Sequence, residues 1–536
     1  MSNIFKKKSI SLLLKEAAAN EGGLKKTLGV WSLIALGIGA IIGAGLFVRT
    51  AAAAGEAAGS GVTLSFALAA IGCAFAGLCY AEFASTIPIA GSAYTYSYAT
   101  LGEIVAWIIG WALLMEYALG AATVSIAWSE YLNNLLGGAI PYEWCHSPFE
   151  HVNKLIGVEN IALLSNELAV TAKNGVVILT DGELAKLAPE VKGLVQTTSG
   201  YLNAPALAIL FLVTLLLIKG TQESAFINGI MVFLKVAIVL VFIFIGWQFI
   251  NPTNHTPYLI PEGVENHEGI FQHGWGGVVG GAAIVFFAFI GFDAVSTAAQ
   301  EAKNPKRDMP IGILGSLVIC TILYILFAHV LTGVAPWEEY EKAGKEASVA
   351  YAVNTYMPGY GWLATSITIA ILAGFSSVIL VMLMGQSRVF YSMSKDGLIP
   401  KVFSDLHPKF KTPYKSNIIL FVLVGLFAAF VPGSVAGDLT SFGTLFAFVI
   451  VCAGIIVMRK KFPHLERPFK TPLVPLVPIL GIGVCTFMII ALDLTTLTVA
   501  GLWMVMGFLI YFTYGKKNSK IGQEEAREEE MDNRPE

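Results

Sequence analysis

Two ionisable side chains lie deep inside long apolar stretches of this sequence. Lys235 stands about ten residues into the stretch 226–249, roughly 15 Å along a helix at 1.5 Å per residue. Glu116 lies near the middle of the stretch 102–129. A charge at such depth must find a partner or exchange its proton, and ionisable residues inside a membrane usually serve a function. We therefore predict proton coupling through Lys235 and Glu116. Purely structural pairing is the alternative for both, and Glu116 could also shape a substrate pocket.

Glycines interrupt two other apolar stretches at corresponding positions. The first interruption, Gly37 to Gly45, contains four glycines, and the second begins at Gly280 and Gly281 and continues to Asp293. Each glycine in a helix interior costs about 1 kcal/mol relative to alanine. Paired interruptions of this kind indicate an inverted repeat with a binding site near the middle of the membrane. Close packing between helices is the alternative explanation for the glycines.

Unwound helix segments expose backbone N–H and C=O groups, which stay unpaired at membrane depth only where they line a cavity or meet a ligand. An amino acid supplies both partners. Its carboxylate suits the N–H groups at the start of a half-helix, and its ammonium suits free carbonyls. Asp293 is expected to cap the second half-helix rather than to bind substrate.

The composition predicts an all-α integral membrane protein. Of 536 residues, 55% are hydrophobic and 13% are charged, against about 25% charged in soluble domains. A membrane crossing needs about 20 apolar residues. This criterion predicts twelve transmembrane helices: 30–54, 61–87, 102–129, 204–218, 226–249, 276–299, 310–332, 361–388, 416–431, 438–458, 473–492 and 497–514.

The lysines and arginines predict the orientation, because cytoplasmic loops carry an excess of both. With the N-terminus inside, most of the 34 fall on the inner side. The few outside are Arg49, Lys154, Lys173, Lys186, Lys192, Lys342 and Lys345. We thus expect a multi-pass protein of the cell (inner or plasma) membrane with both termini cytoplasmic. The expected parts are an N-terminal segment 1–29, a transporter domain 30–514 with repeats of about 30–249 and 276–458 and further helices at 473–514, an external loop 130–203, and a solvated tail 515–536.

Other classes of function find no support. The sequence has no nucleophile elbow, no HExxH and no phosphate-binding loop with its lysine, so neither an enzyme nor an ATP-driven pump is expected. Five of the six cysteines lie in apolar runs, which argues against a disulfide framework or a metal cluster. We expect no cofactor and no nucleic-acid partner; the partners would be a small amino acid, protons and the lipid bilayer. Nothing in the sequence specifies an oligomeric state.

Five segments resemble the amino acid–polyamine–organocation (APC) superfamily, specifically its bacterial cationic-amino-acid-transporter-like branch. They are Gly37 to Phe47, Tyr80 to Tyr94, Phe286 to Asp293, Glu301 to Pro310 and Arg388 to Pro400, and the likeness covers about residues 24–514. The resemblance implies a LeuT-like 5+5 inverted-repeat core plus two C-terminal helices. It also implies that Lys235 takes the place of a sodium ion and that Glu116 matches a glutamate of bacterial members.

The resemblance also implies a set of substrate-binding residues. Amides near Ala44 and Gly45 would hold the carboxylate, and carbonyls near Ile41, Phe287, Ala288 and Ile290 would hold the amine. Where many relatives carry Gly-Ser-Gly or Gly-Thr-Gly, this chain has Gly43, Ala44 and Gly45. A hydroxyl contact is lost while the backbone amides remain.

Together these observations predict a proton-coupled amino acid symporter that works by alternating access. An antiporter of amino acids or polyamines and a non-transporting amino acid sensor are the alternatives. Phe287 and Phe289 suggest an apolar lining, which favours a neutral over a cationic substrate.

Overall fold

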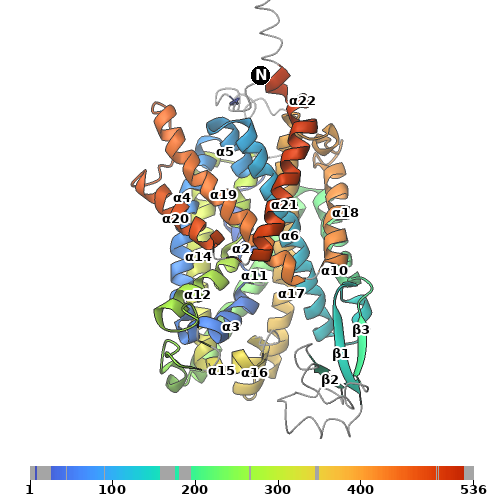
Figure 1. Cartoon of the computed structure of the whole chain (residues 1–536), viewed down its shortest axis with the longest axis vertical. Coiled ribbons are helices and arrows are strands. Elements are labelled where there is room, and N and C mark those ends of the chain that lie inside the picture. Colours follow the sequence, from blue (N-terminus) through green and yellow to red (C-terminus); the bar gives the residue numbers. More distant parts are fainter. Residues whose placement is uncertain are drawn as a thin grey trace, which may run out of the picture.

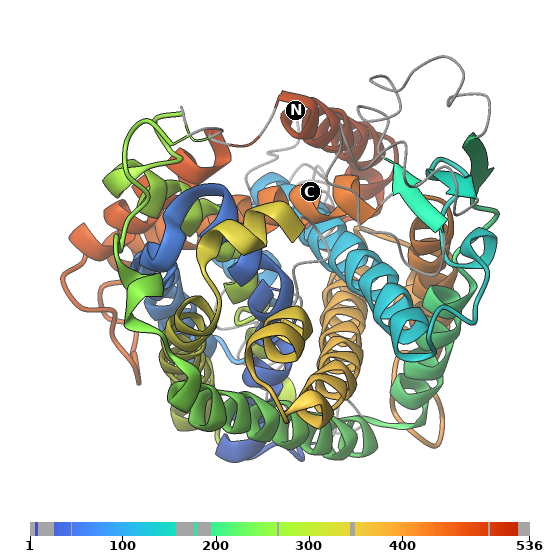
Figure 2. The ribbon, with the colours of Figure 1, turned by 90° about the horizontal axis from the view of Figure 1, so that it is seen from below.

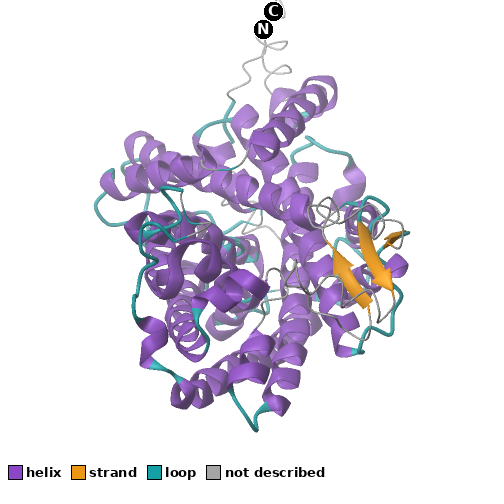
Figure 3. Ribbon diagram, turned by 60° about the horizontal axis from the view of Figure 1, so that its bottom comes forward, coloured by secondary structure: helices purple, strands orange, loops and turns teal. Residues whose placement is uncertain are grey.

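The computed structural model describes residues 6–8, 26–43, 45–89, 91–156, 176–179, 195–264, 267, 269–343, 349–431, 433–490, 492 and 494–523. Most of these residues are helical, and long helices run along the long axis of the molecule (Figure 1). Helix α22 (Lys516–Asn518) lies at one end of this bundle, and the strands lie at the other (Figure 1), where they are the orange arrows of Figure 3.

The twelve predicted stretches each contain a helix. Among the described residues, eight helical segments are long and apolar enough to cross a membrane, and four shorter apolar helices account for the remaining stretches. The helices of the bundle are α2 (Val30–Ile41), α3 (Thr50–Ala53), α4 (Val62–Thr86), α6 (Glu103–Leu135), α10 (Ala204–Lys219), α11 (Thr221–Gly246), α12 (Gly274–Phe286), α13 (Ala294–Thr297), α14 (Pro305–Val334), α17 (Gly361–Lys395), α18 (Tyr414–Phe430), α19 (Gly433–Lys461), α20 (Leu476–Ile490) and α21 (Leu494–Ile510). The connecting helices are α5 (Ser92–Thr100), α15 (Trp337–Ala343) and α16 (Val349–Tyr356).

Both predicted interruptions are present. Helix α2 ends at Ile41, and the chain resumes as the π-helix η1 (Gly45–Arg49) before α3. Helix α12 ends at Phe286 and is followed by the 3-10 turn η7 (Phe287–Phe289) and the short helix α13. The two broken segments touch each other, and α4, α14 and α17 pack against one or the other of them.

The fold is helical as predicted, and the loop 130–203 adds one small sheet to it. Helix α6 runs on to Leu135, and part of the loop folds as an antiparallel sheet in the order β2–β1–β3, formed by β1 (His151–Ile156), β2 (Val176–Leu179) and β3 (Val195–Ser199). Figure 2 shows this sheet at the rim of the bundle. The polar stretches of the loop thus pair their backbone groups with one another.

Within the predicted solvated tail 515–536, Ser519 is a buried exception. Helix α22 (Lys516–Asn518) leads to Ser519, which is 1% exposed and donates a hydrogen bond to the buried carboxylate of Glu103. Tyr98 and Tyr511 donate to the same carboxylate at 2.7 and 2.9 Å. Hydroxyl groups therefore satisfy a buried acidic group and hold the tail against α6.

Candidate functional site

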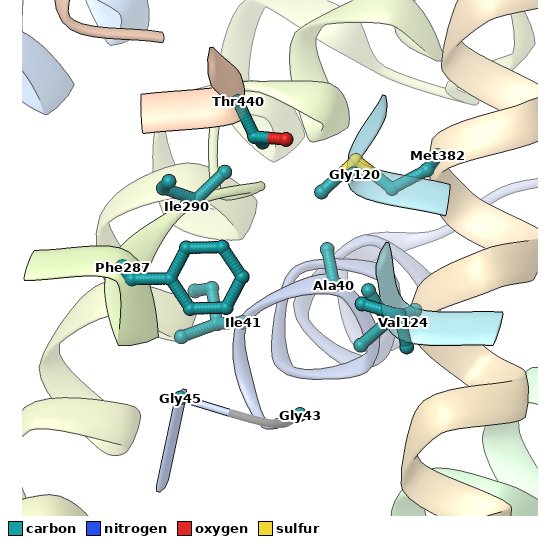
Figure 4. Close-up of a pocket in the computed structure, with 11 residues that line it drawn as sticks. Ala40, Ile41, Gly43, Gly45, Gly120, Val124, Phe287, Ile290, Met382 and Thr440 are labelled. Carbon is teal, nitrogen blue, oxygen red and sulfur yellow. The ribbon is translucent and has the colours of Figure 1, made fainter. Parts of the chain in front are cut away.

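A small cavity lies where the two interrupted segments meet (Figure 4). Five helical regions line it, and their residues are Ala40, Ile41, Gly43, Gly45, Gly120, Val124, Phe287, Ile290, Val378, Met382 and Thr440. Thr440 contributes the one polar side chain in this set, and none of the eleven side chains is ionisable. The lining is therefore suited to an apolar group, and polar recognition falls to the backbone.

Two glycines allow the interrupted segments to approach so closely. A side chain on Gly45 would collide with the backbone of Ala288, so only glycine fits where η1 crosses η7. Gly291 adopts φ +106° directly after η7, in the conformation that glycine tolerates best, and its α-carbon faces Ala40. Gly37 and Gly39 pack against Ser316 and Asn228, so close packing between helices accounts for these two glycines as well as for Gly45.

The hydroxyl of Tyr324 joins the two interruptions. It lies 2.8 Å from the carbonyl oxygen of Ile41 and 2.9 Å from that of Ala288, and it is the only donor of the three groups. The ring of Tyr324 packs against Phe66 and Phe289, with centroid distances of 5.2 and 5.3 Å. Each carbonyl oxygen has a second lone pair, so a bound ammonium group could still share them.

Lys235 is fully buried behind the first interruption. Its Nζ lies 2.9 Å from the carbonyl oxygen of Gly39, 2.8 Å from that of Ile42 and 2.8 Å from Oγ of Ser377. Ser377 in turn donates to the Gly39 carbonyl at 2.7 Å, so its oxygen accepts from Lys235. A protonated lysine has three N–H donors, and three acceptors meet them here. The ammonium form is therefore stabilised by carbonyls that the break in α2 leaves free.

Glu116 and Asp293 are two further buried ionisable side chains. Both are 0% exposed, and Oδ2 of Asp293 accepts a hydrogen bond from Tyr117 at 2.9 Å. Neither carboxylate oxygen of Glu116 has a hydrogen-bond partner among the described residues, and neither has Oδ1 of Asp293. Asp293 takes the predicted cap position of α13, but its side chain makes no capping hydrogen bond. The Asp293 side chain accepts a hydrogen bond from Tyr117 instead.

The predicted binding residues are largely brought together. Ile41, Gly43, Gly45, Phe287 and Ile290 line the cavity; Ala288 does not line it, and its carbonyl oxygen accepts a hydrogen bond from Tyr324. Ala44 lies outside the described residues. Lys235 and Glu116 do not line the cavity, so a direct contact of either side chain with substrate is not part of this geometry.

The sequence analysis did not predict the cavity-lining residues of α6, α17 and α19. These are Gly120, Val124, Val378, Met382 and Thr440. It also missed Tyr324 and Ser377. A hydroxyl inside an apolar span was the available signal for Tyr324, Ser377 and Thr440, whereas Val124, Val378 and Met382 look like any core residue.

Comparisons with known proteins identify relatives of this chain. The family model for amino acid permeases matches residues 28–514. The chain is 42% identical to the branched-chain amino acid permease BcaP of Bacillus subtilis (strain 168), over 97% of this chain and 99% of that protein. It is 36% identical to the methylthioribose transporter of the same organism, over 98% and 100%. It is 30% identical to human cationic amino acid transporter 4, over 83% of this chain and 61% of that protein.

Proposed function

The chain belongs to the amino acid permease family and is a multi-pass membrane protein, and from this premise we propose that it takes up a neutral, apolar amino acid together with a proton. The observation that carries the proposal is the position of Lys235. Two of its three hydrogen bonds end on carbonyls of the interrupted helix that also lines the cavity, and the third ends on Ser377 of α17. A change of protonation on Lys235 would thus reach the substrate site through the backbone of α2.

The apolar lining supports the choice of substrate. Ile290, Val124, Val378 and Met382 surround the space with aliphatic and thioether groups, and no acidic side chain lines it to pair with a cationic substrate. The B. subtilis relative with 42% identity is named for branched-chain amino acids. We therefore propose leucine, isoleucine and valine as the first substrates to test.

Proton coupling would work through the number of N–H donors on Lys235. The ammonium form fills three acceptors, whereas the neutral amine has two N–H groups and a lone pair. After loss of the proton, the Ser377 hydroxyl would turn to donate to the amine, and the Gly39 carbonyl would keep the hydrogen bond from Lys235 but lose the one from Ser377. The end of α2 would then be held less firmly, which couples the proton to the movement of this helix. Glu116 is a second proposed proton site, because its unpaired carboxylate is buried.

For alternating access we propose a fold of the leucine-transporter type, in which two repeats form the core. Repeats of about 30–249 and 276–458 would form the ten-helix core, with α20 and α21 outside it and both termini cytoplasmic. The two interruptions support this arrangement, because each falls in the first helix of its proposed repeat.

The proposal is tested by transport into liposomes. Purified protein is reconstituted without sodium, an inward proton gradient is imposed, and uptake of labelled leucine, isoleucine, valine, lysine and arginine is measured. We expect accumulation of the branched-chain group that a protonophore abolishes. Uptake only after preloading with amino acid would instead establish an exchanger. Saturable binding without any transport would establish a sensor.

One relative favours a second substrate class. The methylthioribose transporter matches this chain over nearly its whole length, and a methylthio group also suits an apolar cavity. Labelled methylthioribose therefore belongs in the same panel. Its accumulation, without accumulation of any amino acid, would replace the branched-chain assignment.

A further inference from the structure

We propose that Arg49 is a specificity-determining residue, a positive charge beside the cavity that excludes cationic amino acids. This inference rests on the proposed function as an amino acid transporter. The juxtaposition that carries it is between Arg49 and Phe287. Phe287 lines the cavity, and the guanidinium carbon of Arg49 lies 5.6 Å from the centre of its ring.

The chain places Arg49 close to the substrate site. Arg49 is the last residue of η1, four residues after Gly45, which lines the cavity. In Figure 4 the ring of Phe287 stands against the cavity between Ile41 and Ile290. Only one aromatic ring therefore separates the guanidinium group from the space that substrate would occupy.

The charge of Arg49 is not neutralised by a neighbour. Within the part of the chain that the structure describes, no aspartate or glutamate forms an ion pair with it, and its guanidinium group lies over the Phe287 ring. Arginine stays protonated at every physiological pH. Since Arg49 is partly buried and the cavity lining carries no charge, its field is weakly screened there.

This field acts differently on neutral and cationic amino acids. A neutral amino acid carries one positive and one negative group, so its net interaction with Arg49 is small. A lysine or arginine substrate adds a positive charge in the side chain and is repelled. At a separation of about 12 Å and an effective dielectric constant of about 20, this repulsion is worth roughly a tenfold change in affinity.

The experiment compares Arg49→Gln with Arg49→Lys. Gln removes the charge, whereas Lys keeps it and loses the flat guanidinium face that stacks on Phe287. Unlabelled lysine and unlabelled isoleucine compete with labelled leucine for uptake into liposomes. Lys306→Gln is the matched control, because it removes an exposed positive charge at the first turn of α14.

We expect Arg49→Gln to strengthen inhibition by lysine about tenfold and to leave inhibition by isoleucine within about twofold. Arg49→Lys and Lys306→Gln should keep the discrimination of the unaltered protein. Inhibition by lysine that does not change in Arg49→Gln would overturn the inference. So would strong inhibition by lysine in the unaltered protein.

A folding defect is separated from a charge effect by a second measurement. The thermal stability of each purified variant is recorded with and without leucine or lysine. Loss of uptake by Arg49→Gln could come from a folding defect alone, so binding is read from thermal stability. If added lysine raises the unfolding temperature of Arg49→Gln but not of Arg49→Lys, the charge effect is supported. Equal behaviour of both variants overturns it. If the unaltered protein takes up no amino acid at all, the proposed function fails, and this result is read before any variant.

Discussion

Gly45 decides at the scale of a single residue whether the two interrupted helices can cross. Its α-carbon faces the backbone of Ala288, and backbone cannot move aside as a flexible side chain can. Gly229 offers the opposite case, a helical glycine with open space where a side chain would stand. The same substitution should therefore have opposite effects at the two positions.

Gly45→Ala should abolish leucine uptake and lower the thermal unfolding temperature, because the added methyl group pushes η1 away from η7. Gly229→Ala should leave uptake unchanged and stabilise α11 by about 0.5–1 kcal/mol. Uptake and thermal unfolding of both purified variants check this. Normal uptake by Gly45→Ala would show that the crossing is looser than the structure has it.

At the scale of elements, Tyr324 ties α14 to both interruptions. Tyr324→Phe removes the shared donor and leaves two buried carbonyls without it. We expect a loss of about 1–3 kcal/mol in unfolding free energy and a weaker apparent affinity for leucine. Tyr514→Phe is the control, because Tyr514 is exposed. Equal stability of the two variants would mean that the Tyr324 hydroxyl does not hold the interruptions together.

The sequence predicted the interruptions but not what faces them. Runs such as Gly37 to Gly45 are costly in a helix, so their presence alone indicates a break. Lys235 was predictable for the same reason, since an isolated charge among apolar residues needs an explanation. The cavity-lining role of Val124, Val378 and Met382 was not predictable. An apolar residue in an apolar helix gives no indication of which neighbour it contacts. The partners of Lys235 were equally hidden, since two of them are backbone carbonyls.

At the scale of the whole molecule, the segment from Tyr511 to Ser519 packs against the start of α6 at one end of the bundle. Its contact with Glu103 joins residues more than 400 positions apart. Sequence composition predicted a solvated tail, because residues 516–536 are rich in charge. The structure shows why that reasoning failed at Ser519, where a single small hydroxyl fits a buried carboxylate.

Ser519→Ala should lower the unfolding free energy by about 1.5–3 kcal/mol, the range for a hydrogen bond to a charged group. Asn518→Ala, one residue earlier and exposed, should change it by less than about 0.5 kcal/mol. Thermal unfolding in detergent measures both. Equal values for the two variants would place the tail in solvent after all.

The central claim is that Lys235 couples a proton to amino acid uptake. The most direct measurement is leucine accumulation in liposomes under an inward proton gradient, over a range of external pH, for the unaltered protein, Lys235→Ala and the exposed control Lys219→Ala. We expect accumulation to rise as external pH falls in the unaltered protein and in Lys219→Ala. Lys235→Ala should show no gradient-driven accumulation at any pH. Accumulation by Lys235→Ala with an unchanged pH profile would contradict the account.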